Sequence, residues 1–254
     1  MVALSGWGVS EHTAAAGTRV HAAVLGRGGG PTVVCVHGLG CSHRYFLPLA
    51  RELVRDAVVV GVDLPGFGRT RGPVDALDVR GLSLALADWV RVSGRRGAVF
   101  LGNSTGCQVV VDLAVHSPQL LGPVVLVGPT VDRRARTVRQ HAARLLADER
   151  WEPASLGPVL LADWMACGAR RYAQTLAYML ADPVERKLHH VRVPTVVVRG
   201  ARDPIVPRAW AAEVVDRLPA GRLAEVPGAG HTLNWSAPKE LGRVVGPLLA
   251  RAAP

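Results

Sequence analysis

The stretch Gly102-Asn103-Ser104-Thr105-Gly106 decides the fold. It follows an apolar run at residues 98–101 that is typical of a buried strand, and it precedes residues 107–115, which have helical spacing. A serine between glycines at such a strand-to-helix turn is typical of a nucleophile elbow, because small neighbours avoid clashes in a strained backbone. The next helix directs its positive N-terminal end at the serine, which favours a developing oxyanion. We therefore expect Ser104 to be a nucleophile.

Short apolar runs alternate with helical patterns along most of the chain. Strand-like runs occupy residues 19–25, 32–36, 57–62, 98–101, 124–127, 195–198 and 223–226. Helical patterns occupy residues 45–54, 82–92, 107–115 and 239–251. The first two runs, joined by a turn at 26–31, predict a hairpin-like start of the sheet. The alternation predicts an α/β fold with a mostly parallel sheet and helices on both faces. In such sheets, ligands bind beyond the carboxyl ends of the strands.

Residues 130–191 interrupt this alternation. They form a stretch of about 60 residues without a strand-like run, which is longer than a usual connection. Five apolar residues within it follow helical spacing, namely Val131, Ala135, Val138, Ala142 and Leu145. We predict a core domain made of residues 1–129 and 192–254, with residues 130–191 inserted as a helical cap over one end of the sheet.

Two later strand ends supply the groups that a serine nucleophile needs, a base and an acid that orients it. Asp203 lies in Gly200-Ala201-Arg202-Asp203-Pro204, and His231 lies in Gly228-Ala229-Gly230-His231-Thr232. The chain order Ser, Asp, His belongs to one family of serine hydrolases and differs from the orders of the others. Asp132, just beyond the strand-like run at 124–127, is the alternative acid.

A glycine-containing loop, His37-Gly38-Leu39-Gly40, follows the run at 32–36. Its glycines let the backbone approach the serine, so that an amide N–H faces the oxyanion. Together with the amide of Thr105, this N–H completes a hole with two donors. We expect His37 to brace the loop and not to act as a second base, and Asp63 to organise its own turn.

These motifs together resemble the α/β-hydrolase superfamily. The matching segments are residues 37–40, Asp63-Leu64-Pro65-Gly66-Phe67-Gly68, and residues 102–106, 200–204 and 230–231. They lie within a region from about residue 20 to 245. The resemblance implies that Ser104 is the nucleophile, His231 the base, Asp203 its orienting acid, and Leu39 and Thr105 the oxyanion amides. It also implies that the cap at 130–191 shapes the substrate pocket.

The reaction class has several interpretations. Asn103 before the serine is similar to the carbon–carbon bond hydrolases of the superfamily, but Thr232 stands where those enzymes typically have Trp, and esterases also carry Asn before Ser. We predict a serine hydrolase that cleaves an ester, thioester or lactone of a small, largely apolar substrate through an acyl-serine intermediate. The alternatives are a carbon–carbon bond hydrolase, an acyltransferase and a cofactor-free haloperoxidase-like enzyme. A non-hydrolytic receptor of the same fold is the alternative from another class, and the intact triad disfavours it.

Substrate contacts are expected from Asn103, Gly38, Trp164, Tyr172 and Trp235. Arg170 and Arg171 have two interpretations. In the favoured one, both are solvated surface residues. In the other, one of them binds a substrate carboxylate through two parallel hydrogen bonds.

The net charge of +10 comes from 30 Lys and Arg residues that are dispersed along the chain, and only Lys187 and Lys239 are lysines. Because nucleic-acid-binding proteins concentrate charge on one element, we expect no nucleic-acid partner. Cys35, Cys41, Cys107 and Cys167 lack the spacing of a zinc site or a disulfide framework, and no metal or cofactor is expected. Without a signal peptide or a long apolar segment, we predict a cytoplasmic protein with no membrane partner. The oligomeric state is left open.

Overall fold

Eight strands form one sheet in the computed structural model, which describes residues 6–252. They are β1 (Val9–Ala15), β2 (Thr18–Leu25), β3 (Thr32–Val36), β4 (Val58–Val62), β5 (Val99–Asn103), β6 (Val124–Val127), β7 (Thr195–Gly200) and β8 (Gly221–Val226). Their order in the sheet is β1-β2-β4-β3-β5-β6-β7-β8. All neighbours from β4 to β8 are parallel, whereas β1 and β2 are antiparallel to their neighbours. The predicted mostly parallel α/β sheet is confirmed.

The start of the sheet differs from the prediction. A hairpin between residues 19–25 and 32–36 was expected, but β2 pairs with β1 on one side and with β4 on the other. The hairpin turn is Ala16-Gly17, where both residues have a positive φ, of 52° and 68°. β3 lies instead between β4 and β5. The expectation was wrong because β1 is mostly exposed and its sequence, VSEHTAA, carries little apolar signal.

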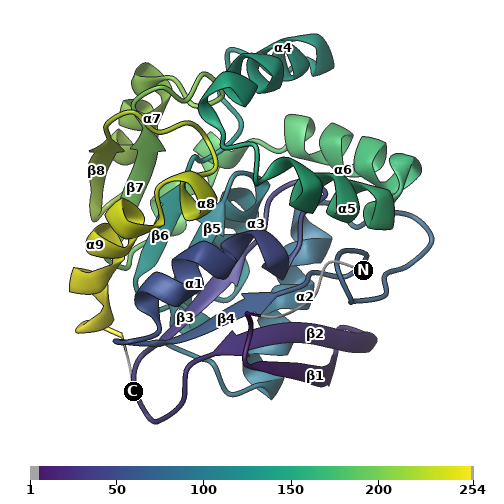
Figure 1. Ribbon diagram of the computed structural model, residues 1–254, viewed down its shortest axis with the longest axis vertical. Coiled ribbons are helices and arrows are strands. Elements are labelled where there is room, and N and C mark those ends of the chain that lie inside the picture. Colours follow the sequence, from purple (N-terminus) through teal and green to yellow (C-terminus); the bar gives the residue numbers. More distant parts are fainter. Residues whose placement is uncertain (1–5, 253–254) are drawn as a thin grey trace.

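Helices surround the sheet (Figure 1). They are α1 (Leu47–Leu53), α2 (Val79–Val92), α3 (Thr105–His116), α4 (Val138–Asp148), α5 (Gly157–Cys167), α6 (Ala169–Ala181), α7 (Arg208–Asp216), α8 (Leu233–Ser236) and α9 (Pro238–Leu249). Short 3-10 turns are η1 (His43–Phe46), η2 (Pro118–Leu120), η3 (Glu149–Trp151), η4 (Val184–Arg186) and η5 (Leu188–His190).

Two apolar clusters cover the two faces of the sheet. Successive residues of a strand point to opposite faces, and β3 shows the consequence. Val34 and Val36 belong to the cluster that contains residues of α2, α3 and α7. Val33 and Cys35 belong to the cluster that contains residues of α1, α8 and α9. With both faces covered, the carboxyl ends of the parallel strands are the edge of the sheet at which the loops gather. All four cysteines are free and buried.

Residues 130–191 contain α4, α5 and α6 with the turns η3 to η5, and no strand lies in this segment, all of which the structure describes. Figure 1 shows the three helices gathered at one end of the sheet, away from β1 and β2. The division into a core domain and a cap stays a prediction, which this arrangement supports. Within residues 6–252, no helix is long and apolar enough to cross a membrane.

Helix α4 differs from the predicted apolar stripe. It begins at Val138 because Thr137 and Gln140 form a capping box, so that the first two residues of the stripe precede the helix. Val138 is 56% exposed and Ala142 is exposed too, whereas His141 is buried. The prediction was wrong because it treated residues 131–145 as one helix, whereas residues 130–137 are a loop and the helix begins at Val138.

Candidate active site

Ser104 occupies the sharp turn between β5 and α3. Its φ of 55° and ψ of −121° lie outside the conformations that residues with a side chain usually adopt. A Cβ atom on Gly106 would lie 2.1 Å from the carbonyl oxygen of Val36, and a Cβ atom on Gly102 would lie 2.7 Å from the amide nitrogen of Cys107. The turn therefore needs glycine at both flanking positions. Ser104 itself is half-buried.

Asp203 and His231 meet at the ends of β7 and β8. The Nδ1 atom of His231 lies 2.8 Å from Oδ2 of Asp203. The other carboxylate oxygen, Oδ1, accepts hydrogen bonds from the backbone amides of Ile205 at 2.8 Å and Val206 at 3.0 Å. These bonds fix the carboxylate, so that Nδ1 is the protonated nitrogen of a neutral imidazole. Nε2 of His231 is buried and has no hydrogen-bond partner among residues 6–252. This nitrogen is therefore free to accept a proton.

Electrostatics favour an ionised Asp203 and a strongly basic His231. Burial by itself raises the pKa of Asp203, but the His231 charge and the hydrogen bonds from His231, Val206 and Ile205 outweigh it and lower the pKa below its ordinary value. Burial lowers the pKa of His231, but Asp203 first, and then two further carboxylates, outweigh it and raise the pKa to about 9. The pair is thus suited to taking up a proton.

Asp132, the alternative acid, is bound elsewhere. Its Oδ2 accepts a hydrogen bond from Arg144 at 3.0 Å, and its Oδ1 accepts one from the backbone amide of Arg134 at 3.1 Å. The geometry therefore favours Asp203 as the partner of His231.

The loop at residues 37–40 reaches Ser104, as the sequence predicts. A Cβ atom on Gly38 would lie 3.1 Å from the Cβ atom of Ser104 and 3.3 Å from the carbonyl oxygen of Asn103. Nε2 of His37 accepts a hydrogen bond from the backbone amide of Leu64 at 3.1 Å, and Nδ1 donates to the carbonyl of Gly38 at 2.9 Å. Burial lowers the pKa of His37 and so keeps it neutral. His37 is therefore a brace of this loop.

Leu39 and Thr105 both lie next to Met179. Thr105 is the first residue of α3, and its hydroxyl donates to the sulfur of Met179 at 2.8 Å. Leu39 packs against a small cluster of buried apolar side chains, Val131, Met179 and Leu180. This placement supports the expected roles of their amides in an oxyanion hole, which stay predictions.

A phenol that sequence reasoning missed connects these loops. The hydroxyl of Tyr45 accepts a hydrogen bond from the amide of Gly38 at 2.7 Å and donates one to Oδ1 of Asn103 at 2.9 Å. Nδ2 of Asn103 donates to the carbonyls of Val127 at 3.2 Å and His231 at 3.5 Å. Both amide hydrogens of Asn103 thus have protein acceptors, and the residue is only 2% exposed. In place of the expected substrate contact, Asn103 holds the nucleophile turn to its neighbours.

The expected aromatic contacts separate into two groups. Trp164 and Tyr172 pack edge to face with ring centroids 5.8 Å apart. A Cβ atom on Gly40 would lie 2.8 Å from both rings, so the loop at 37–40 passes directly beneath them. Trp235 does not belong to this pair, and its Nε1 donates to the hydroxyl of Ser155 at 3.1 Å.

A cavity of about 330 Å³ lies beside His231. It is lined by Leu145, Asp148, Glu149, Glu152, Pro153, Ala154, Leu156, Gly157, Leu160, Leu161, Trp164, His231 and Thr232. Most of its wall is apolar and comes from residues 145–164. Three acidic side chains line it, whereas no Lys or Arg from the described part of the chain does. Of the expected contacts, Trp164 lines this cavity, whereas Gly38, Asn103, Tyr172 and Trp235 do not. Of the three residues expected to catalyse the reaction, His231 lines it, whereas Ser104 and Asp203 do not.

The comparison with known families agrees with this geometry. Residues 33–244 match the model of a family described as the alpha/beta hydrolase family. The chain belongs to the α/β hydrolase family. The resemblance and the fold inferred from the motifs are confirmed.

Known proteins that resemble the chain differ in the reactions for which they are named. The protein RutD of Rhizobium rhizogenes strain K84, named for carbamate hydrolysis, is 26% identical over 249 residues, which cover 87% of this chain and 93% of RutD. The polyketide synthase ThaQ of Burkholderia thailandensis is 31% identical over 244 residues, or 84% of this chain, but the chain spans only 11% of that synthase. The crystal structure of the enol-lactonase from Burkholderia xenovorans LB400 superimposes with a TM-score of 0.78 and 22% identity, covering 94% of this chain and all of that one.

Arg170 and Arg171 of this α/β hydrolase do not line the cavity. Arg170 donates to Asp75 at 2.6 Å, and both side chains are exposed. Arg171 donates to the carbonyl of Pro73 at 2.5 Å and covers Gly66. The structure thus favours the surface interpretation for Arg170. Arg171 is half-buried against the loop at Gly66, and its Nη1 is buried without a hydrogen-bond partner among residues 6–252.

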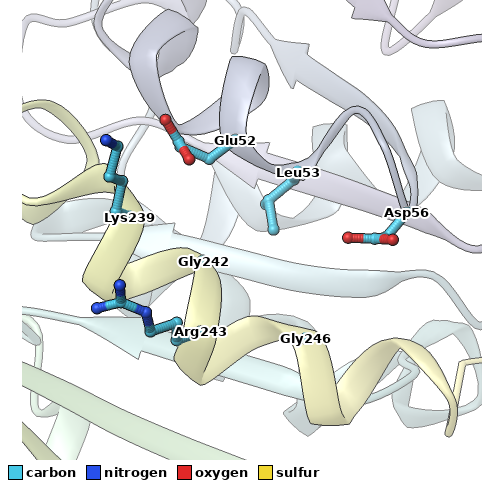
Figure 2. A pocket seen from close by; sticks show the side chains of 7 residues that line it. All are labelled: Glu52, Leu53, Asp56, Lys239, Gly242, Arg243 and Gly246. Carbon is cyan, nitrogen blue, oxygen red and sulfur yellow. The ribbon is translucent and has the colours of Figure 1, made fainter.

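A second cavity, of about 360 Å³, lies between α1 and α9 (Figure 2). It is lined by Glu52, Leu53, Asp56, Lys239, Gly242, Arg243 and Gly246. None of the predicted site residues belongs to it. The cavity beside His231 is therefore the one associated with the candidate active site.

One buried group has residue types that can bind a metal. Nitrogen and oxygen atoms of His21, His43 and Asp63 lie within 4.8 Å of one another. The carboxylate of Asp63 already accepts hydrogen bonds from Nδ1 of His21 at 2.8 Å, from Nδ1 of His43 at 3.0 Å and from two backbone amides, those of His43 and Arg69. These four donors account for the cluster as a clamp between β2, η1 and the loop after β4. Asp63 thus organises its turn as predicted, with two histidines that the motifs did not indicate.

Proposed function

We propose that this chain is a serine hydrolase that cleaves an ester, thioester or lactone of a small, largely apolar substrate through an acyl-serine intermediate. The observation that carries the proposal is the 2.8 Å bond between His231 and Asp203. It leaves Nε2 of His231 without a partner in the described part of the chain, while Ser104 occupies a strained turn at the end of β5 in the same sheet. A base, its orienting acid and a nucleophile are the set that acyl transfer needs.

The first half of the reaction forms the acyl-enzyme. Nε2 of His231 takes the proton of the Ser104 hydroxyl while its oxygen attacks the carbonyl carbon of the substrate. The amides of Leu39 and Thr105 stabilise the oxyanion of the tetrahedral intermediate. When the intermediate collapses, His231 gives its proton to the leaving oxygen or sulfur. Asp203 remains ionised throughout, because its role is to hold the imidazole and stabilise its charged form.

The second half repeats these steps with water. His231 removes a proton from a water molecule, whose oxygen attacks the acyl carbon, and then returns the proton to Ser104. The products are a carboxylic acid and the free enzyme. In a lactone both products are parts of one molecule, so that a hydroxy acid leaves.

The cavity beside His231 supports a small apolar substrate. Its volume of about 330 Å³ is at the lower end of the range of small-molecule sites. Leucines at 145, 156, 160 and 161 and the indole of Trp164 supply its apolar wall. An acyl chain or ring placed there would be removed from water next to the base.

Labelling with a fluorophosphonate tests the nucleophile. We expect the wild-type protein and Ser155→Ala, which changes an exposed serine, to be labelled and to hydrolyse a panel of acyl esters. We expect Ser104→Ala to be folded, unlabelled and inactive. Labelling that persists in folded Ser104→Ala would overturn the proposal. Product analysis with added alcohol distinguishes hydrolysis, which yields the acid, from acyl transfer, which yields a new ester.

A further inference from the structure

Two carboxylates from the segment 130–191 bind the loop that carries His231. Oδ1 of Asp148, the last residue of α4, accepts a hydrogen bond from the backbone amide of His231 at 3.1 Å. Oε1 of Glu152, just after η3, accepts one from the backbone amide of Thr232 at 2.6 Å. A Cβ atom on Gly230 would lie 2.9 Å from the first oxygen and 3.0 Å from the second. The two carboxylates therefore bind the consecutive amides of His231 and Thr232, and the glycine before them leaves room for both oxygens.

No Lys or Arg of residues 6–252 lines the cavity beside these carboxylates. Around them, Arg144 of α4 is bound to Asp132 and to the carbonyl of Ile205, and Arg202 lies over the ring of Trp151 at 4.3 Å. His141 of α4 lies close enough to His231 for their charges to interact. Burial first, and then His231 and Arg144, lower the pKa of His141 to about 4, so its imidazole is neutral. Two further acidic side chains are nearby: Asp203, which is bonded to the imidazole of His231, and Glu149, which lines the cavity.

We propose that Asp148 and Glu152 are positioning residues for His231, which fix its loop from the cap side and stabilise the protonated form of its imidazole. This inference rests on the proposed role of His231 as the base. Taking the Ser104 proton creates an imidazolium, and a negative charge nearby favours that charged form. Both carboxylates contribute, after Asp203, to the raised pKa of His231. Burial raises the pKa of Asp148 to about 7, so that Asp148 is ionised across the range in which His231 loses its proton.

Amide substitutions separate the charge of these residues from their hydrogen bonds. The carbonyl oxygen of Asn or Gln accepts a backbone N–H as a carboxylate does, but it carries no charge. Asp148→Asn and Glu152→Gln therefore keep the hydrogen bonds to the loop and remove the negative charge near the imidazole of His231. Asp216→Asn is the matched control, because the Asp216 carboxylate is exposed at the end of α7 and lines neither of the two cavities described above.

The experiment measures the titration of the His231 ring by NMR in the folded protein and the pH profile of kcat/KM for a neutral ester. In Asp148→Asn and in Glu152→Gln, we expect the His231 pKa and the kinetic pKa to fall together by about 1 unit. In Asp216→Asn, both values stay near those of the wild-type protein. Thermal unfolding identifies a variant that fails to fold, and the other variant then decides.

The proposal is overturned if the His231 pKa in both folded amide variants equals that of Asp216→Asn. The NMR titration needs no turnover, so it also separates the two proposals. If the amide variants lower the His231 pKa but the wild-type protein has no hydrolase activity, the proposed function is contradicted and the electrostatic role of Asp148 and Glu152 remains. If the wild-type protein is active but the amide variants leave the His231 pKa unchanged, only the role of Asp148 and Glu152 is contradicted.

Discussion

The hydroxyl of Tyr45 donates a 2.9 Å hydrogen bond to the carboxamide oxygen of Asn103, the residue directly before Ser104. The same hydroxyl accepts the amide of Gly38, so that one phenol joins the two loops expected to form the oxyanion hole. Tyr45 and Asn103 are each only 2% exposed, which shields this bridge from water. Burial raises the pKa of Tyr45 well above its usual range, and the phenol therefore stays a neutral donor.

Tyr45→Phe removes this bridge and leaves the amide of Gly38 and the oxygen of Asn103 unpaired inside the protein. Unsatisfied buried polar groups cost about 1–3 kcal/mol, so we expect the free energy of unfolding to fall by that amount. We also expect kcat to fall with little change in KM, because the loops move while the cavity wall is unchanged. Urea unfolding and steady-state kinetics measure both. Tyr178→Phe, at a residue that is 38% exposed, is the control, and equal stabilities of the two variants would contradict the role of the bridge.

Asp203→Asn removes the negative charge from the partner of His231 and favours the wrong imidazole tautomer. We expect kcat to fall on the order of 10⁴-fold, as the same change does in a serine protease. Asp132→Asn changes an acid that binds Arg144, so kcat stays within a few-fold of wild type. Ester hydrolysis by the two variants compares the residues directly. A larger loss in Asp132→Asn would move the acid to the end of β6.

The pH dependence of activity follows from the raised pKa of His231. Only the neutral imidazole takes up the Ser104 proton, so kcat/KM falls as the pH drops below about 9. The stability has the opposite dependence. A pKa raised in the folded state contributes stability below about 6.5, and this contribution is lost as the pH rises to about 9. Kinetics and urea unfolding between pH 6 and 10 test both directions, and a kcat/KM that is constant from pH 6 to 9 would contradict the value for His231.

Gly106→Ala places a methyl group against the backbone of β3. The new Cβ atom would lie 2.1 Å from the carbonyl oxygen of Val36, and this oxygen belongs to a central strand that has little freedom to move. We expect a loss of about 1–3 kcal/mol in unfolding free energy, together with loss of activity as the turn shifts. Gly246→Ala is the control, because its Cβ atom in α9 meets nothing within 4 Å. That variant is expected to gain up to about 1 kcal/mol from helix propensity.

The sequence predicts those residues of the site that can be recognised from the few residues around them. Ser104 and Asp203 follow the buried strands β5 and β7, and His231 follows β8, whose apolar signal is weaker. Parallel strands bring their carboxyl ends to one edge. The placement of these three residues therefore follows from the strand pattern alone. The hairpin of β1 and β2 was missed for the converse reason, since β1 is an exposed edge strand with hardly any apolar periodicity.

The contacts between distant segments were not predictable in this way. Tyr45 lies in a helical pattern, and nothing in that pattern shows that its hydroxyl reaches Asn103, 58 residues away. Asp148 and Glu152 bind backbone amides, which leave no signature in the side-chain sequence. Their positions depend on how the helices of residues 130–191 lie on the sheet, and that depends on tertiary packing.

The burial of every cysteine has a practical consequence for following these helices in solution. Burial raises the pKa of all four thiols, so that they react slowly with alkylating reagents. Met165 lies on α5, next to the cavity residue Trp164, and is 76% exposed. Met165→Cys would place one readily accessible thiol on that helix without removal of any native cysteine. A fluorophore or spin label attached there would report whether α5 moves when an ester occupies the cavity.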